Sequence, residues 1–171
     1  MANLDNPLGF QPVGHLLGGE IRTVSILRTS GAAIYKGDML KGVGATGTVE
    51  VAAHTDTTAI IGVSADWIKA AAAATTMCRV YVDPFIIFKV QSVTGQTPAA
   101  TDVFGAAPID TYAAGSTTLG NSITELGTIT TGTLQWLVIG KVDSPDNVWG
   151  AHCDLLVIRN LGFFTDSSTG I

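Results

Sequence analysis

Apolar and hydroxyl residues alternate along much of this chain, and that period of two constrains the fold more than any other feature. In residues 23–26 and 48–51 every second side chain is apolar. Such alternation is typical of a strand with one buried face. The same reasoning predicts strands at 23–26, 48–51, 59–63, 79–82, 85–90, 134–142 and 154–159. We therefore expect an all-β fold, an antiparallel β-sandwich or β-barrel with at most one short helix.

Three segments between the expected strands need a separate interpretation. The Asp83-Pro84 pair indicates a bulge, an edge or a turn, because proline donates no ladder hydrogen bond. The alanine-rich run 69–76 predicts one or two helical turns or a low-complexity loop. Residues 95–121, rich in Ala, Thr, Gly and Pro, predict a long loop with at most a short hairpin. We expect residues 21–171 to form a single β-rich domain.

Residues 1–20 combine apolar side chains with prolines and glycines that interrupt regular structure. We expect an extended N-terminal arm that docks either along another protein or onto its own domain, and the sequence leaves both alternatives open. Leu8, Phe10 and Val13 are the expected anchors of such an arm. The full set of expected contact residues is Leu8, Phe10, Pro12, Val13, Leu16 and Leu17.

Few residues carry charge: 13% are Asp, Glu, Lys or Arg, against roughly 25% in an ordinary globular domain. The chain is also 46% hydrophobic with a mean hydropathy of +0.38. Its net charge of −5 and scattered basic residues argue against nucleic-acid binding. No apolar run approaches the roughly 20 residues of a spanning helix, and the first residues do not resemble a signal peptide. Protein–protein contact is the remaining way to cover so apolar a surface.

No pattern in the sequence predicts catalysis, a cofactor or a metal site. The stretch 42–47 matches G-x-G-x-x-G, but a strand pattern follows it where a dinucleotide site needs a helix, so we expect a hairpin loop. His15, His54 and His152 lack ligand spacing, although a site joining His152 to Cys153 or Asp154 in space stays open. The two cysteines, Cys78 and Cys153, fit buried free thiols in a reducing compartment.

Several blocks of the sequence resemble the structural cement (head decoration) proteins of tailed bacteriophages. The blocks are residues 6–22, 80–84, 88–91 and 144–151, and they span most of the chain in order. The resemblance implies a β-rich virion protein, made in the bacterial host cytoplasm, on the outer surface of the icosahedral capsid. It implies that the protein bridges capsomers against internal DNA pressure. The implied partners are the major capsid protein and copies of itself, as a homotrimer or a dimer.

A different class of function remains open from the residues themselves. Trp67, Trp136 and Trp149 could line a sugar site, because aromatic faces stack on pyranose rings. The alternative is therefore a receptor- or carbohydrate-binding β domain of a phage tail or head fibre. Trp136 lies within an apolar strand pattern, which favours a place in the core instead.

Overall fold

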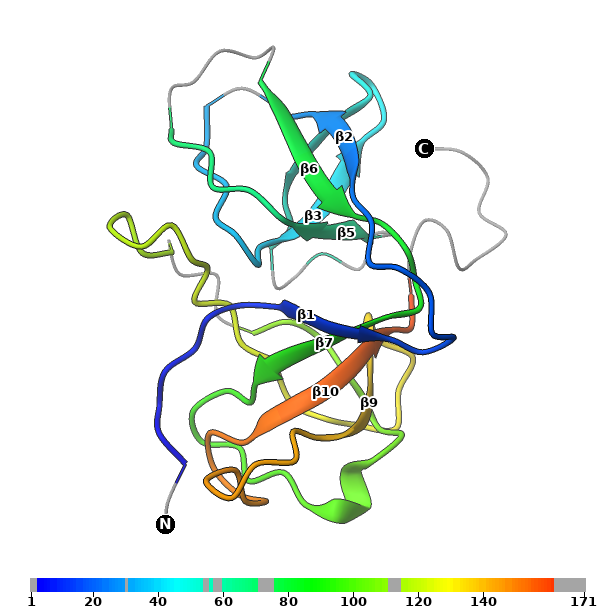
Figure 1. Cartoon of the computed structure of the whole chain (residues 1–171), viewed down its shortest axis with the longest axis vertical. Helices are drawn as coiled ribbons and strands as arrows, with labels where there is room; N and C mark the ends of the chain where they lie inside the picture. Colours follow the sequence, from blue (N-terminus) through cyan, green and yellow to red (C-terminus); the bar gives the residue numbers. More distant parts are fainter. Residues whose placement is uncertain are drawn as a thin grey trace.

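The computed structural model describes residues 3–29, 31–53, 56, 60–70, 76–110 and 115–161, and these form two antiparallel five-stranded sheets that pack together (Figure 1). Sheet A has the order β1-β7-β10-β9-β8 and sheet B the order β2-β6-β5-β3-β4. The elements are β1 (Gln11–His15), β2 (Val24–Leu27), β3 (Met39–Val43), β4 (Thr48–Val51), β5 (Ile60–Ser64), β6 (Met77–Tyr81), β7 (Ile86–Gln91), the 3₁₀ turn η1 (Ala100–Asp102), β8 (Ala106–Ala107), β9 (Trp136–Lys141) and β10 (Asp154–Arg159). The expected all-β sandwich is confirmed.

All seven strands predicted from the alternation are present, within a few residues of the expected ends. The 42–47 motif closes a hairpin, as expected: β3 ends at Val43, the Gly47 amide bonds the Val43 carbonyl at 2.9 Å, and β4 begins at Thr48. Strands β1, β3 and β8 were not predicted. In the alanine-rich run, residues 71–75 lie outside the described residues, as do residues 111–114 of the 95–121 segment.

The chain passes from one sheet to the other at two neighbouring places. It leaves sheet A after β1, builds sheet B with β2 to β6, and returns to sheet A at β7. The Asp83-Pro84 pair lies in the return turn, as its proline indicated, and the Leu16 amide bonds the Phe85 carbonyl at 2.8 Å across the two crossovers.

The main hydrophobic core fills the space between the sheets. Burial along β10 alternates residue by residue, so Leu155 and Val157 point into this core while their neighbours are half-buried. Phe88 and Trp136 meet edge to face, with ring centroids 5.5 Å apart. A second, smaller cluster joins Leu40, Val49 and Val80 on strands of sheet B to Ile34 and Ile68, which pair outside the named strands. The outer edges of sheet B approach each other there, because the Thr29 amide bonds the Val49 carbonyl at 2.8 Å.

A buried arginine at the end of β10 ties the two sheets together. Arg159 is 6% exposed and donates to the backbone carbonyls of Ile60, Ile61 and Val82, all of which belong to sheet B or the return turn. Burial lowers the pKa of this guanidinium to about 10. The carbonyl oxygens replace the water that the charged group loses on folding.

Both cysteines are buried free thiols, as the sequence indicated. Burial raises the pKa of Cys78, and it raises the pKa of Cys153 to about 11. Both thiols are therefore protonated and unreactive at neutral pH, since the thiolate is the nucleophile.

Candidate interaction surface

Residues 3–10, which we call the strap, lie along their own sheet A before β1 begins (Figure 1). Two side-chain amides, which we call clasps, bond the strap to the body of the protein. The first clasp is Asn3, whose side-chain nitrogen donates to the carbonyls of Val148 at 2.8 Å and Ala151 at 2.7 Å. Its amide oxygen accepts the Val148 backbone N–H at 2.9 Å. One asparagine side chain thus joins the strap to the turn before β10.

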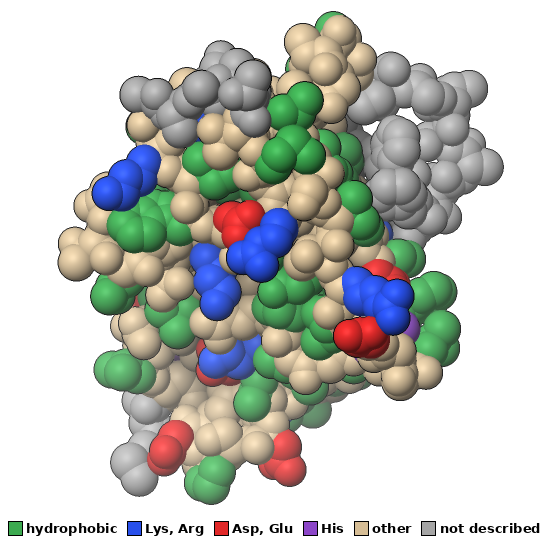
Figure 2. Space-filling model, turned by 45° about the horizontal axis from the view of Figure 1, so that its top comes forward, with side chains coloured by type: hydrophobic (Ala, Val, Ile, Leu, Met, Phe, Trp, Pro, Cys, Tyr) green, Lys and Arg blue, Asp and Glu red, His purple; other side chains and the backbone are tan. Residues whose placement is uncertain are grey.

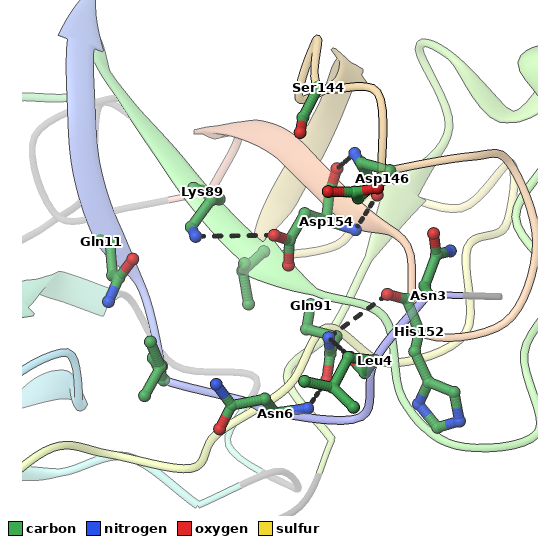
Figure 3. A pocket seen from close by; sticks show the side chains of 14 residues that line it. Asn3, Leu4, Asn6, Gln11, Lys89, Gln91, Ser144, Asp146, His152 and Asp154 are labelled. Atoms are coloured by element: carbon green, nitrogen blue, oxygen red, sulfur yellow. Dashed lines mark hydrogen bonds and ion pairs between the residues drawn. The ribbon is translucent and has the colours of Figure 1, made fainter. Parts of the chain in front are cut away.

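Gln91, at the end of β7, is the second clasp (Figure 3). Its side-chain nitrogen donates to the Leu4 carbonyl at 2.8 Å and the His152 carbonyl at 3.3 Å, and its oxygen accepts the Asn6 amide at 3.0 Å. Gln91 is 6% exposed, so these bonds are shielded from water. A single buried amide therefore satisfies backbone groups from two segments that are otherwise far apart in the chain.

The strap ends in the core. Phe10 is 1% exposed and stacks on Trp136, with ring centroids 4.3 Å apart. Just before it, Gly9 has φ +67°, and a Cβ there would lie 2.5 Å from the Ser122 side chain, so only glycine fits this approach. The prediction that Phe10 anchors an arm on another protein is wrong, because its ring is buried in the hydrophobic core of its own domain.

The six expected contact residues divide into inward and outward groups. Leu8 and Pro12 are half-buried and Phe10 is buried, whereas Val13, Leu16 and Leu17 are 52%, 49% and 69% exposed. Of the two alternatives left open, the strap follows its own domain. Among the six expected contact residues, only Val13, Leu16 and Leu17 present their side chains to solvent, and within the strap Leu4 is 78% exposed.

Val13, Leu16 and Leu17 share their neighbourhood with Phe85, which is 43% exposed in the return turn. We call these four residues the apolar rim. The Leu16–Phe85 backbone bond joins the two crossovers, and the rings of His15 and Phe85 lie 6.3 Å apart. Sequence reasoning assigned Phe85 to a strand and missed its exposure.

His15 and Asp83 hold the rim in shape. The amides of Leu17 and Gly19 donate to His15 Nδ1 at 3.2 and 3.0 Å, so the imidazole proton sits on Nε2, which faces Asp83 Oδ2 at 3.1 Å. The other Asp83 oxygen accepts the Phe85 amide at 2.8 Å. Burial opposes ionisation of Asp83, but the bonds from Phe85 and His15 outweigh it and lower its pKa below the ordinary value. His15 thus positions the backbone that carries the rim residues.

A groove runs between β1 and sheet B next to the rim. It encloses about 400 Å³ and is lined by Leu8, Pro12 and Val13 on one side and by Lys36 and Tyr81 on the other. Among the described residues no strand pairs with the outer edge of β1, which borders this groove. An unpaired strand edge is a template for an extended segment of another chain.

Other regions also expose apolar side chains, among them Leu4 at 78% and Leu119 at 70%. On sheet B, Leu27 of the edge strand β2 lies opposite Met77 of β6, and they are 40% and 49% exposed. Phe104, after η1, is 76% exposed and has φ +70°, a left-handed conformation that is rare for an aromatic residue. Figure 2 shows one face on which hydrophobic side chains reach the surface at many places between scattered Lys, Arg, Asp and Glu side chains.

The three tryptophans do not present a common aromatic face. Trp136 is buried, and Trp149 is half-buried against the main core. Trp67 is 39% exposed and lies beneath Lys69, whose Nζ is 5.4 Å from the ring centroid. The sugar-binding alternative would therefore depend on Trp67 alone among these three.

The strap covers a narrow cavity of about 220 Å³ beside Gln91, Lys89 and Asp154. This volume falls below the roughly 300 Å³ of small-molecule sites. Next to it the structure brings together Asp5, Glu125 and His152. His152 pairs with neither Cys153 nor Asp154 in that group, and His54 lies outside the described residues.

Comparisons of the chain with protein-family models, with curated proteins and with solved structures each found no match. In the described part of the chain, no helix is long and apolar enough to cross a bilayer.

Proposed function

We propose that this chain is a structural cement protein of a tailed bacteriophage, which binds the outer surface of the icosahedral head and bridges neighbouring capsomers. It acts without catalysis, and its partners are the major capsid protein and further copies of itself. The proposal joins the resemblance of blocks 6–22, 80–84, 88–91 and 144–151 to the surface found here.

The observation that carries the proposal is the apolar rim beside the unpaired edge of β1. Val13 and Leu17 expose 52% and 69% of their surface on a segment held by His15 and Asp83. A soluble protein that orders apolar side chains at such a place gains when a partner covers them. The groove next to them accepts an extended segment, for which we name the major capsid protein as the source.

The low charge of the chain suits this mode of binding. Contacts made by apolar side chains and backbone bonds depend little on ionic strength, whereas surface ion pairs weaken as salt rises. Binding to heads is therefore expected to persist from low to physiological salt. A steep loss of bound protein over that range would contradict an apolar rim as the main contact.

The test uses heads assembled without this protein, to which the purified chain is added before pelleting. Wild type is expected to co-sediment, and electron microscopy of the pelleted heads is expected to show added density over the seams between capsomers. The double variant Leu16→Ser/Leu17→Ser should bind at least about tenfold more weakly, since each buried leucine contributes about 1.5–3 kcal/mol.

Leu119→Ser is the matched control. Leu119 is 70% exposed, as is Leu17 at 69%, and its loop projects from the side of the molecule opposite the rim in Figure 1. Equal binding by the rim variant and the control would reject the rim as the docking surface. Absence of wild-type binding to heads, together with binding to a glycan array, would replace the proposal with the receptor- or carbohydrate-binding alternative.

Deletion of residues 2–19 is the weaker test. It would remove Phe10 from the core and β1 from the edge of sheet A, so a loss of binding would follow from a damaged fold. Point substitutions of exposed side chains are the better test, because they can weaken binding to heads without disturbing the fold.

A further inference from the structure

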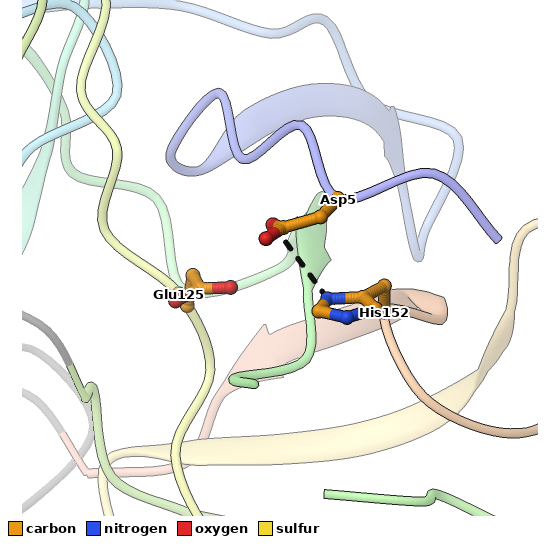
Figure 4. Close-up of side chains that lie close together, drawn as sticks. All are labelled: Asp5, Glu125 and His152. Atoms are coloured by element: carbon orange, nitrogen blue, oxygen red, sulfur yellow. Dashed lines mark ion pairs between the residues drawn. The ribbon is translucent and has the colours of Figure 1, made fainter. Parts of the chain in front are cut away.

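Three side chains with metal-binding atoms meet where the strap crosses the body of the protein (Figure 4). Asp5 comes from the strap, Glu125 from the segment before β9, and His152 from the turn before β10. One ligand atom of each lies within 4.8 Å of the other two. They are separated by up to 147 residues in sequence, so the fold alone brings them together.

The backbone around each of the three is fixed by the same residue, Gln91. Its side chain bonds the residues on either side of Asp5 and the carbonyl of His152. Its own carbonyl accepts the Leu126 amide at 2.8 Å, directly after Glu125. A backbone held in this way keeps the three residues next to one another before any ligand arrives, which favours metal binding.

The histidine contributes a nitrogen that the protein leaves without a hydrogen bond. His152 Nδ1 is buried and has no hydrogen-bond partner among the described residues; its nearest opposite charge is Asp5 Oδ1 at 3.6 Å. A buried imidazole nitrogen aimed at carboxylate oxygens is well placed to bind a cation. Glu125 is 6% exposed, and one of its carboxylate oxygens lies within 4.8 Å of the ligand atoms of Asp5 and His152.

The donor set selects the class of ion. One imidazole and two carboxylates match the nitrogen and oxygen ligands of Zn²⁺, with the remaining position open to water. Mg²⁺ and Ca²⁺ prefer oxygen ligands alone. Tetrahedral Zn²⁺ places its ligand atoms about 3.4 Å apart. Asp5 is exposed and can rotate to close the remaining gap from the observed spacing.

We propose that Asp5, Glu125 and His152 form a Zn²⁺ site that fastens the strap to the body of the protein. The site joins three chain segments, so bound metal raises resistance to unfolding of the strap. This inference does not depend on the proposed function.

The test measures Zn²⁺ binding to tag-free full-length protein that has been stripped with a chelator. Calorimetric titration with ZnSO₄ is expected to show one ion per chain and an increase in Tm on loading. His152→Asn is the first variant, because asparagine tolerates the left-handed backbone at φ +55°. It should weaken binding by roughly 100-fold or more, as should Glu125→Gln, since loss of even an outer partner costs 10–100-fold.

Asp146→Asn is the matched control: it removes an exposed carboxylate of the adjacent cavity that is not part of the cluster. It should bind Zn²⁺ as wild type does. Circular dichroism checks that each variant is folded. If a variant fails to fold, Co²⁺ added to the wild type gives a second readout, with absorption bands of a nitrogen- and oxygen-ligated ion expected. Zn²⁺ affinity unchanged in His152→Asn, or no binding by the wild type, would overturn the site.

Discussion

The strap and the apolar rim are neighbours in sequence and behave in opposite ways. Residues 3–10 are held by the side-chain amides of Asn3 and Gln91 and end in a core phenylalanine, whereas Val13, Leu16 and Leu17 are exposed to solvent. Both stretches contain several apolar residues and a glycine. The difference comes from their partners: the side-chain amides of Asn3 and Gln91 bond the strap to the body of the protein, while His15 and Asp83 hold the backbone of the rim. Apolar composition alone therefore does not reveal whether a segment faces inward.

Phe10→Ala is expected to have the largest effect and would show how far the strap belongs to the fold. Removing a ring that stacks on Trp136 leaves a cavity and should lower the free energy of unfolding by about 3–5 kcal/mol. Urea denaturation measures this change. Leu17→Ala, on the rim, is the comparison and should change it by less than about 0.5 kcal/mol. An equal decrease in the free energy of unfolding in both variants would contradict the view that the strap is part of the fold and the rim is not.

Gln91→Ala tests the clasp itself. The change leaves the Leu4 carbonyl, the Asn6 amide and the His152 carbonyl without their partner, so stability should fall by roughly 1–3 kcal/mol. Hydrogen exchange should accelerate at the Asn6 amide and stay slow in β9. Gln11→Ala is the control, because Gln11 makes none of these bonds. Unchanged exchange at Asn6 would mean that the clasp does not hold the strap.

Acidification should loosen the rim and spare the strap. The folded-state pKa of Asp83 lies below the ordinary aspartate value of 3.8, so ionised Asp83 stabilises the fold above that pH. That contribution is lost as the pH falls below 3.8 through the folded-state pKa. The Asp83 side chain is 38% exposed, so the change should stay below about 1 kcal/mol.

Amide chemical shifts of Phe85 and Leu17 report on this titration. They should move together below pH 4 in the wild type, and that shared movement should disappear in Asp83→Asn. If the wild-type Leu17 amide shift stayed constant while the Asn6 amide shift moved with pH, acid would be loosening the strap and not the rim, which would contradict this prediction.

Leu17→Ser should have the smallest effect on the fold. Leu17 is 69% exposed, so its replacement should leave the urea midpoint within about 0.5 kcal/mol of wild type. Self-association measured by light scattering should weaken if the rim also joins copies of this chain. A large loss of stability would place Leu17 with the strap.

The sequence allowed the alternating strands to be predicted because each has one buried face. β10 shows it well: Leu155 and Val157 are buried between half-buried neighbours. β1 escaped prediction because Pro12 and Gly14 weaken any local strand preference. It forms by pairing with β7, and a bulge between these two residues accommodates them. β3 was missed because Gly42 falls inside the glycine-rich motif, and β8 has only two residues.

The interaction surface was predictable only in part, for a physical reason. Apolar residues such as Phe10 and Leu17 cannot be told apart from the sequence alone, because the exposure of a side chain depends on what the tertiary fold packs against it. The cluster of Asp5, Glu125 and His152 could not be predicted from the sequence either, because no spacing rule joins residues from three distant segments.

The two crossovers between the sheets have a mechanical consequence. They are tied by the Leu16–Phe85 bond, so a pull applied at that corner reaches β1 and β7 in one sheet and β2 and β6 in the other at the same moment. The load divides between two separate hydrogen-bonded ladders, and Arg159 transmits part of it from layer to layer. A contact site at such a corner is expected to resist unfolding under force better than one attached to the end of a single strand.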